Sequence, residues 1–141
     1  MLNISNELSI SASIRANTYD TANAATLDGT GVNIAELDDK MLLVTVDAAL
    51  ASTGETMTFT VEHSYDDVTY AAVPAAALVD PATGEADTFT VNTAAVAVFE
   101  TLGLKRDLLR QYVRVKGTAA GNGTPAYYCA AYILGRRKYA T

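Results

Sequence analysis

The sequence contains no tryptophan, one histidine, one cysteine and three prolines among its 141 residues. A single cysteine, Cys129, cannot close a disulfide within the chain, so we expect the fold to form without one. No apolar run approaches the roughly 20 residues that a membrane-spanning helix requires. Residues 1–15 lack a basic region followed by an apolar one, and we therefore expect no secretory signal.

The shortage of histidine and cysteine also limits the chemistry that the chain can perform. His63 is the only imidazole, so any nucleophile–base pair would have to include it. It shares one face of a predicted strand with Met57 and Phe59, which is typical of packing at a core margin. Cys129 lies among small and aromatic residues, where an unreactive buried thiol is expected. We expect no enzyme, no catalytic residues and no cofactor.

Two acidic pairs, Asp38–Asp39 and Asp66–Asp67, are the only clustered candidates for a metal site. Neither lies in the D-x-[DN]-x-[DN]-G pattern of a calcium loop, and we expect no metal. Asp66–Asp67 separates two strand-like segments, residues 57–65 and 68–73. Because aspartate side chains bond backbone N–H groups in turns, this pair predicts a hairpin turn, with Pro74 ending the second strand.

Charge is distributed unevenly along the chain. Residues 1–100 carry 15 acidic and two basic residues, a net charge of −13, and residues 101–141 carry +7. The whole chain is acidic, with a net charge of −6 and a pI of about 4.6, so its field would repel a polyanion. We expect no nucleic-acid partner. The basic C-terminal part is expected to contact acidic surface in the same fold or on a neighbouring subunit.

Most of the sequence has the pattern of short strands separated by Gly, Asn and Asp turns. These predicted strands are residues 8–14, 41–46, 57–65, 68–73, 88–91, 111–116 and 126–134. The apolar segment 41–46 is expected at the centre of a sheet, and Val113 and Val115 are expected to face inward. Segment 126–134, AYYCAAYIL, has apolar or aromatic residues on both faces. One segment has helix signals instead: a short helix could begin at Asn92 or Thr93 and end at Gly103.

The number and spacing of these strands predict an all-β fold. We expect an antiparallel β-sandwich, jelly-roll-like, with about eight strands and at most one short helix. The prediction is one domain over residues 1–141, with 1–7 as an N-terminal arm and 136–141 as a C-terminal tail. The order of the strands is left open. Eight tyrosines, three of them in segment 126–134, suggest an interface or a sugar platform, with plain packing as the alternative.

The order of several segments resembles a known group of proteins. A strand ending near Val46 is followed by FTVEHSYDD, then TYAAVP, then QYVRVKGTAAGNGTP, and finally ILGRR. Over about Asn33 to Arg137 this order resembles small virion proteins of tailed bacteriophages of the capsid decoration (cement) type. The chain departs from that pattern at Val68, where the family usually has glycine, and by an insertion, DLLRQ, before Tyr112.

The resemblance implies a protein that binds the assembled capsid shell and stabilises it. Its partners would be the major capsid protein and other copies of itself, as a homotrimer. It would be made in the host cytoplasm and lie on the capsid surface of the virion. We expect the interface to include the basic segment Arg136, Arg137, Lys138 and Tyr139. Two alternatives stay open: a tail or neck component of the virion, and a discoidin-like carbohydrate-binding sandwich, which the SxDD…TY…YVRV text also resembles.

Overall fold

The computed structural model describes residues 8–20, 26–50, 56–85, 87–89, 98–120 and 126–138. These residues form ten strands and two short 3-10 segments and contain no α-helix. The strands are β1 (Leu8–Asp20), β2 (Thr26–Asp28), β3 (Val32–Asn33), β4 (Leu37–Leu50), β5 (Thr56–Ser64), β6 (Ala71–Ala72), β7 (Leu78–Val79), β8 (Val98–Leu104), β9 (Tyr112–Ala120) and β10 (Ala126–Arg137). The 3-10 segments are η1 (Ala75–Ala77) and η2 (Arg106–Leu108).

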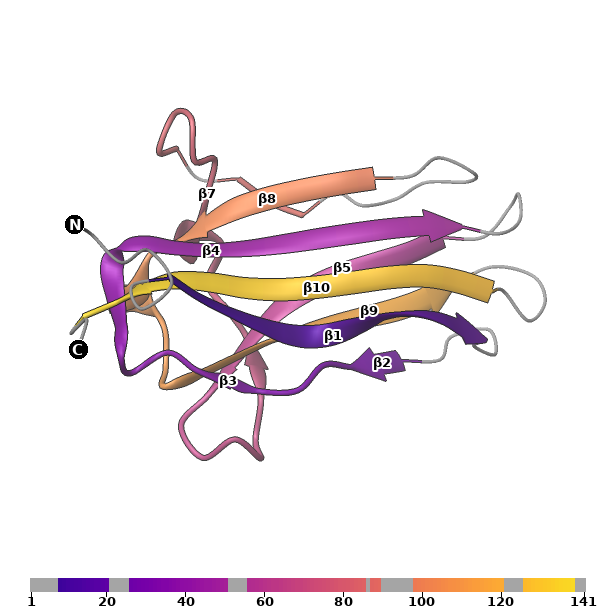
Figure 1. Ribbon diagram of the computed structural model, residues 1–141, viewed down its shortest axis with the longest axis horizontal. Coiled ribbons are helices and arrows are strands. Elements are labelled where there is room, and N and C mark those ends of the chain that lie inside the picture. Colours follow the sequence, from indigo (N-terminus) through magenta and orange to yellow (C-terminus); the bar gives the residue numbers. More distant parts are fainter. Residues whose placement is uncertain are drawn as a thin grey trace.

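The strands form two antiparallel sheets that lie one over the other (Figure 1). Sheet A has the order β1-β10-β4-β8-β7, and sheet B has the order β2-β9-β5-β6, with β3 beside β9. The chain therefore pairs in a nested way: β1 with β10, β2 with β9, β4 with β8, and β5 with β6. This is the strand order of a jelly roll, and the predicted all-β sandwich is confirmed.

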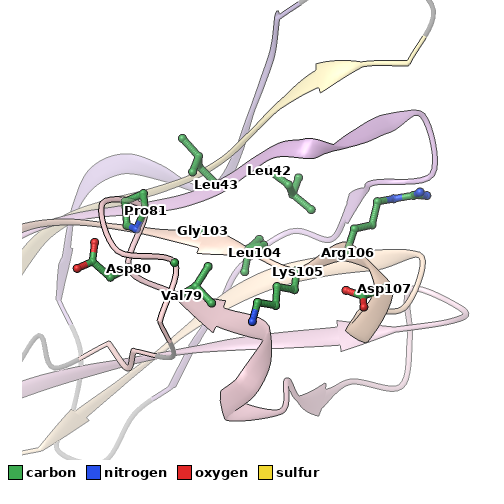
Figure 2. A pocket seen from close by; sticks show the side chains of 11 residues that line it. Leu42, Leu43, Val79, Asp80, Pro81, Gly103, Leu104, Lys105, Arg106 and Asp107 are labelled. Atoms are coloured by element: carbon green, nitrogen blue, oxygen red, sulfur yellow. The ribbon is translucent and has the colours of Figure 1, made fainter.

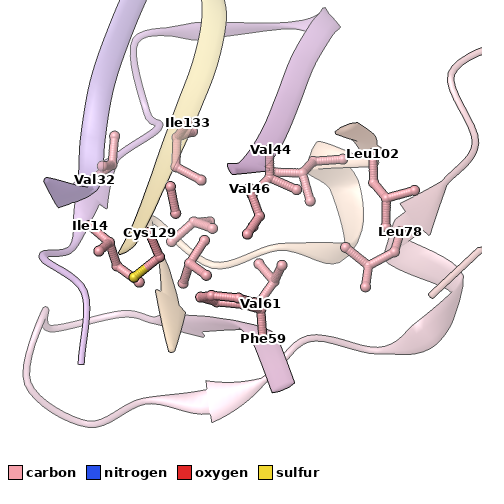
Figure 3. Close-up of a cluster of buried hydrophobic side chains, with 14 of the residues drawn as sticks. Ile14, Val32, Val44, Val46, Phe59, Val61, Leu78, Leu102, Cys129 and Ile133 are labelled. Carbon is pink, nitrogen blue, oxygen red and sulfur yellow. The ribbon is translucent and has the colours of Figure 1, made fainter. Parts of the chain in front are cut away.

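The core lies between the two sheets and is built by alternation along the strands. Val44 and Val46 of sheet A point toward Phe59 and Val61 of sheet B (Figure 3). Phe59 is 1% exposed, and both β4 valines are fully buried. Because successive strand residues face opposite sides, each strand contributes every second side chain to this interior. The sheets are thus held together by a single apolar layer.

Close packing also depends on a glycine that lies opposite large side chains of the neighbouring strand. Gly117 of β9 pairs with Phe59 of β5, and a Cβ added there would lie 2.8 Å from the Cε of Met57. Gly117 therefore makes room for Met57 and Phe59 in the same layer. The strand predicted over residues 111–116 therefore extends further, because β9 continues through Gly117 to Ala120.

Several predicted elements are confirmed. β4 is the central strand of sheet A, and Val113 and Val115 face the core while their neighbours on β9 do not. Pro74 follows β6 directly after Val73, as expected for a residue with no N–H to pair.

No described helix is long and apolar enough to cross a membrane.

Other expectations are wrong. The helix expected to end at Gly103 is not formed over the described residues, because 98–104 is strand β8, paired with both β4 and β7. Residues 92–97 of that expectation lie outside the described residues. The segment 68–73 contains only the two-residue strand β6, and residues 88 and 89 are not in a strand. Cross-strand pairing, which the local pattern does not reveal, decided these elements.

The predicted arm, residues 1–7, lies outside the described residues, as do residues 139–141 of the predicted tail. The described start of that tail continues the sheet, because β10 runs to Arg137.

Candidate functional site

His63 is buried at the end of β5 and is occupied by a structural contact. The backbone N–H of Arg110 donates to its Nδ1 over 3.3 Å. Burial, and then the positive charge of Arg110, lowers the pKa of His63 below its usual value. An imidazole that accepts this bond at Nδ1 is favoured in its neutral form. Among the described residues, no three His, Cys, Asp or Glu side chains gather as metal ligands would.

Cys129 is equally enclosed. Its side chain is fully buried in the core, and burial raises the pKa of the thiol to about 11, with a smaller contribution from Asp47. A thiol with this pKa is almost entirely protonated at neutral pH, so it is a poor nucleophile. The thiol is placed as the sequence predicted.

The acidic pair forms the predicted turn, and Asp66 holds it together. Asp66 accepts from the backbone N–H groups of Val68 and Thr69, over 3.0 and 2.8 Å, and from the Ser64 hydroxyl, over 2.7 Å. These bonds, led by that of Thr69, lower the pKa of the carboxyl. The side chain of Asp66 is therefore used by its own turn.

The adjacent Asp67 explains how the chain turns without the glycine of the related pattern. Asp67 has a φ of 60°, a conformation that aspartate tolerates better than most residues. Its carboxylate accepts a hydrogen bond from the Tyr70 hydroxyl, and burial together with this bond raises the pKa of Tyr70. A Cβ at Gly31 would collide with both partners, at 1.8 and 2.0 Å. Glycine at 31 thus lets this loop close on the body of the sandwich.

The outer face of sheet B is polar and cross-linked by charge. Arg114 of β9 forms ion pairs with Glu62 of β5 over 2.7 Å and with Asp28 of β2 over 3.1 Å. Its guanidinium also lies over the Tyr70 ring, 4.0 Å from the centroid. Lys116 reaches the same two carboxylates at 3.9 Å. One arginine therefore connects three strands and the acidic turn.

The basic segment predicted to form an interface contacts the chain's own residues 35–38. Arg136 forms an ion pair with Asp38, and Lys138 donates from Nζ to the Ala35 carbonyl and from its backbone to Glu36. Arg137 is exposed and lies opposite Leu37 in the sheet. Tyr139 lies outside the described residues. The basic C-terminal part thus contacts acidic surface of the same fold, one of the two outcomes expected from the sequence.

Two hollows lie at the end of the sandwich that carries η2. The first has a volume of about 580 Å³, and Figure 2 shows Leu42 and Leu43 of β4 above Val79 and Lys105. The second, of about 450 Å³, is lined by Ile34, Ala35, Tyr65, Arg106, Leu109, Arg110 and Gln111. In the second, the Arg110 guanidinium lies 4.7 Å from the centroid of the Tyr65 ring, which is 74% exposed.

The outer face of sheet A was predicted from the sequence only at segment 126–134, which belongs to β10. Its strands present outward the side chains that alternate with the buried ones. Thr45 and Ala130 on this side are themselves buried, at 8% and 3% exposure. Most of the others are apolar or uncharged: Leu8, Ile10, Ala12, Leu43, Val79, Phe99, Thr101, Tyr128, Tyr132 and Leu134. We call this set the apolar face. The signal was present in AYYCAAYIL, which has apolar residues on both sides of a strand.

Comparison with known proteins adds information on the fold. No family model and no curated protein matches the sequence. The chain is similar to a protein in the "Structure of infectious bursal disease virus Gx strain", with a TM-score of 0.55 and 9% identity over 94% of this chain and 33% of that one. It is also similar to the "Crystal structure of infectious bursal disease virus VP2 subviral particle", with a TM-score of 0.50 and 9% identity over 92% and 32%.

At this level of identity the likeness concerns the fold alone, and the chain spans about a third of the length of these two proteins. The class that follows is a jelly-roll β-sandwich, which viral capsid domains, lectins and cupins share.

Proposed function

We propose that this chain is a structural protein of a virion, of the capsid decoration (cement) type, that binds and stabilises the assembled shell of a bacteriophage. The observation that carries this is the nested strand order, β1-β10-β4-β8 over β2-β9-β5-β6, which supports a virion role because proteins of a virus particle have a similar fold. The segment order from FTVEHSYDD to ILGRR supports the narrower assignment to decoration.

The role needs a rigid body with adhesive surfaces and no reactive group. The ion pairs of Arg114 and the single apolar core supply rigidity, and His63 and Cys129 are both held in structural contacts. A shell repeats each contact many times, so weak individual contacts suffice for stable attachment. The proposed partner is the major capsid protein, at the capsid surface of the virion after synthesis in the host cytoplasm.

The proposed contact is the basic segment Arg136–Tyr139. Within it, Arg136 and Lys138 bind residues 35–38, so their removal would disturb the fold as well as any interface. Arg137 is exposed, which makes it the residue of choice for a test. Self-association belongs to the proposed function, and the sequence-based expectation is a homotrimer.

The direct test is co-sedimentation of the purified chain with empty shells. The unmodified protein should pellet with shells and saturate at a fixed ratio to the major capsid protein. Arg137→Glu should lower occupancy, whereas Lys105→Glu, the same charge change at an exposed site elsewhere, should not. A protein that stays in the supernatant at every shell concentration would refute the proposed role. Equal occupancy of the two variants would remove the basic segment from the contact.

One observation favours a second function, carbohydrate binding. The hollow at Tyr65 combines an exposed aromatic ring with two arginines, Arg106 and Arg110, as sugar-binding loops often do. Binding of the isolated chain to a glycan array, lost in Tyr65→Ala, would support this alternative. A tail or neck location is distinguished by immuno-gold labelling of virions, which would mark the tail instead of the head.

A further inference from the structure

The apolar face covers the middle of sheet A, on strands β1, β10, β4 and β8. Ile10 is 60% exposed, Tyr128 46% and Phe99 73%. Cross-strand pairing makes these residues part of one surface, since Ile10 lies opposite Leu134 on β10, and Leu134 lies opposite Leu43 on β4. Charged residues on these strands include Asp47 and Arg136, at opposite ends of the face, and the exposed Arg15 of β1. Continuous exposed apolar surfaces of this kind mark interfaces.

The apolar face is about as large as the smallest specific interfaces between proteins. From Tyr128 to Arg136 along β10 the surface extends about 30 Å, and four strands span about 19 Å, at the usual rise and strand spacing. Two such surfaces packed together would bury about 1,100 Å² before side-chain relief is counted, near the lower end for specific interfaces.

We propose that the apolar face of sheet A packs against the apolar face of a second copy of this chain. Identical faces match here because both are nearly uncharged, whereas the outer face of sheet B carries Arg114, Lys116, Glu62 and Asp28. Packing sheet A on sheet B of a neighbour would desolvate those ion pairs against apolar side chains, which is costly. A two-fold contact of like faces avoids that cost.

The charges at the two ends of the face define the relative orientation of the copies. Arg136 lies at the end of β10 that pairs with β1 near Leu8, and Asp47 lies opposite Ala130, six residues back along β10. When the strands of the two copies run in opposite directions, Arg136 of each copy lies over the Asp47 end of the other. Running in the same direction, the copies would bring the two Asp47 carboxylates together. Between Asp47 and Arg136, which also pairs with Asp38 of its own chain, charge complementarity favours the antiparallel pair.

This contact closes at two copies and does not depend on a shell. It therefore differs from the homotrimer expected from the sequence. It uses Arg136 of the basic segment, but it does not use the exposed Arg137, on which the test of shell binding rests. A virion protein that pairs in this way would present two basic segments, one from each copy, and so gain avidity on a repeating surface.

The experiment is the solution mass of the full chain by light scattering, over a dilution series at micromolar concentration. The unmodified chain should have the mass of two copies and dissociate on dilution. Ile10→Lys/Phe99→Lys should weaken the pair by about 100-fold or more, since it removes two buried anchors and adds like charges to both copies. Val68→Lys changes an equally exposed apolar residue, 81% exposed, outside this face, and should leave the mass unchanged.

The orientation has its own variant, Asp47→Arg, which places like charges near Arg136 of the other copy and should weaken the pair by about tenfold. A monomer at every concentration, a mass of three copies, or a dimer that survives Ile10→Lys/Phe99→Lys would overturn the proposed pairing. If Asp47→Arg leaves the dissociation constant of the pair unchanged, the antiparallel orientation is overturned. Shell co-sedimentation of the same variants separates the two proposals, because a pairing-deficient chain with an intact basic segment should still bind shells, although more weakly.

Discussion

The two outer faces of this sandwich are built from strands of the same kind, but they differ in what covers them. On sheet B, Arg114 connects Glu62, Asp28 and Tyr70 into one network. On sheet A, the corresponding positions hold leucine, isoleucine, phenylalanine, tyrosine, alanine and threonine. A sheet in water is expected to carry polar side chains on its outer face. Sheet B follows this rule, and sheet A departs from it, which is why sheet A is assigned a partner.

The largest effect is expected in the interior that the two faces share. Phe59→Ala removes the ring of a side chain that is 1% exposed and lies between the sheets, which should lower the free energy of unfolding by about 3–5 kcal/mol. Urea unfolding followed by circular dichroism measures this. Because both sheets depend on one layer, the variant should lose both in a single transition. Two separate transitions would show that the sheets are stable independently, and would contradict the view that the two faces share one core.

The next effect distinguishes the polar face. Arg114→Met keeps the packing of the side chain but leaves Glu62, whose side chain is 13% exposed, without its closest ion-pair partner. We expect a loss of about 1–3 kcal/mol in the free energy of unfolding. Lys116→Met is the matched control, because its contacts are 3.9 Å long and its side chain is more exposed, so about 0.5 kcal/mol is expected. Equal losses in the two variants would contradict the central place given to Arg114.

The extent to which the sequence predicted the fold follows from how local each signal is. The alternation in residues 57–65 and the pair Asp66–Asp67 depend on neighbours in the chain, and they gave a strand and a turn that the structure confirms. The prediction of a helix ending at Gly103 was wrong because the short segment 98–104 has no strong local pattern. Its strand conformation comes from pairing with β4, whose partner residues lie 50 to 60 positions earlier in the chain.

The candidate site was predicted in part for the same reason. The basic segment was visible as a run of charge, but its contacts with residues 35–38 depend on the return of β10 to the start of β4. Likewise, Tyr65 and Arg110 are brought together by tertiary packing. The apolar face needs the order of four strands before its residues can be recognised as one surface.

A smaller effect concerns His63, which is on sheet B but faces the interior. Burial lowers its pKa in the folded state, so the folded chain binds this proton less readily than the unfolded chain. The contribution of neutral His63 to the stability of the fold is fully present above pH 6.5, the pKa in the unfolded chain. It is lost as the pH falls from 6.5 toward the lower pKa of the folded chain. The urea midpoint should therefore decrease between neutral and mildly acidic pH.

The matched variant for this effect is His63→Gln, which can keep an acceptor for the Arg110 N–H but does not titrate. The difference in midpoint between the unmodified protein and this variant should depend on pH below 6.5 and be constant above it. Parallel curves for the two proteins throughout would show that His63 does not change its protonation on unfolding.

The smallest effect is expected on the apolar face of a dilute, unpaired chain. Phe99 is 73% exposed, so Phe99→Thr, which preserves strand propensity, should change the free energy of unfolding by no more than about 0.5 kcal/mol. This change in the free energy of unfolding is measured by chemical denaturation, at the lowest protein concentration that fluorescence can detect. The same substitution should lower stability at high concentration, where pairing contributes by mass action. A large loss of stability in the dilute chain would mean that Phe99 packs within the monomer. The apolar side chains of sheet A would then stabilise the fold of one copy and would not indicate a partner.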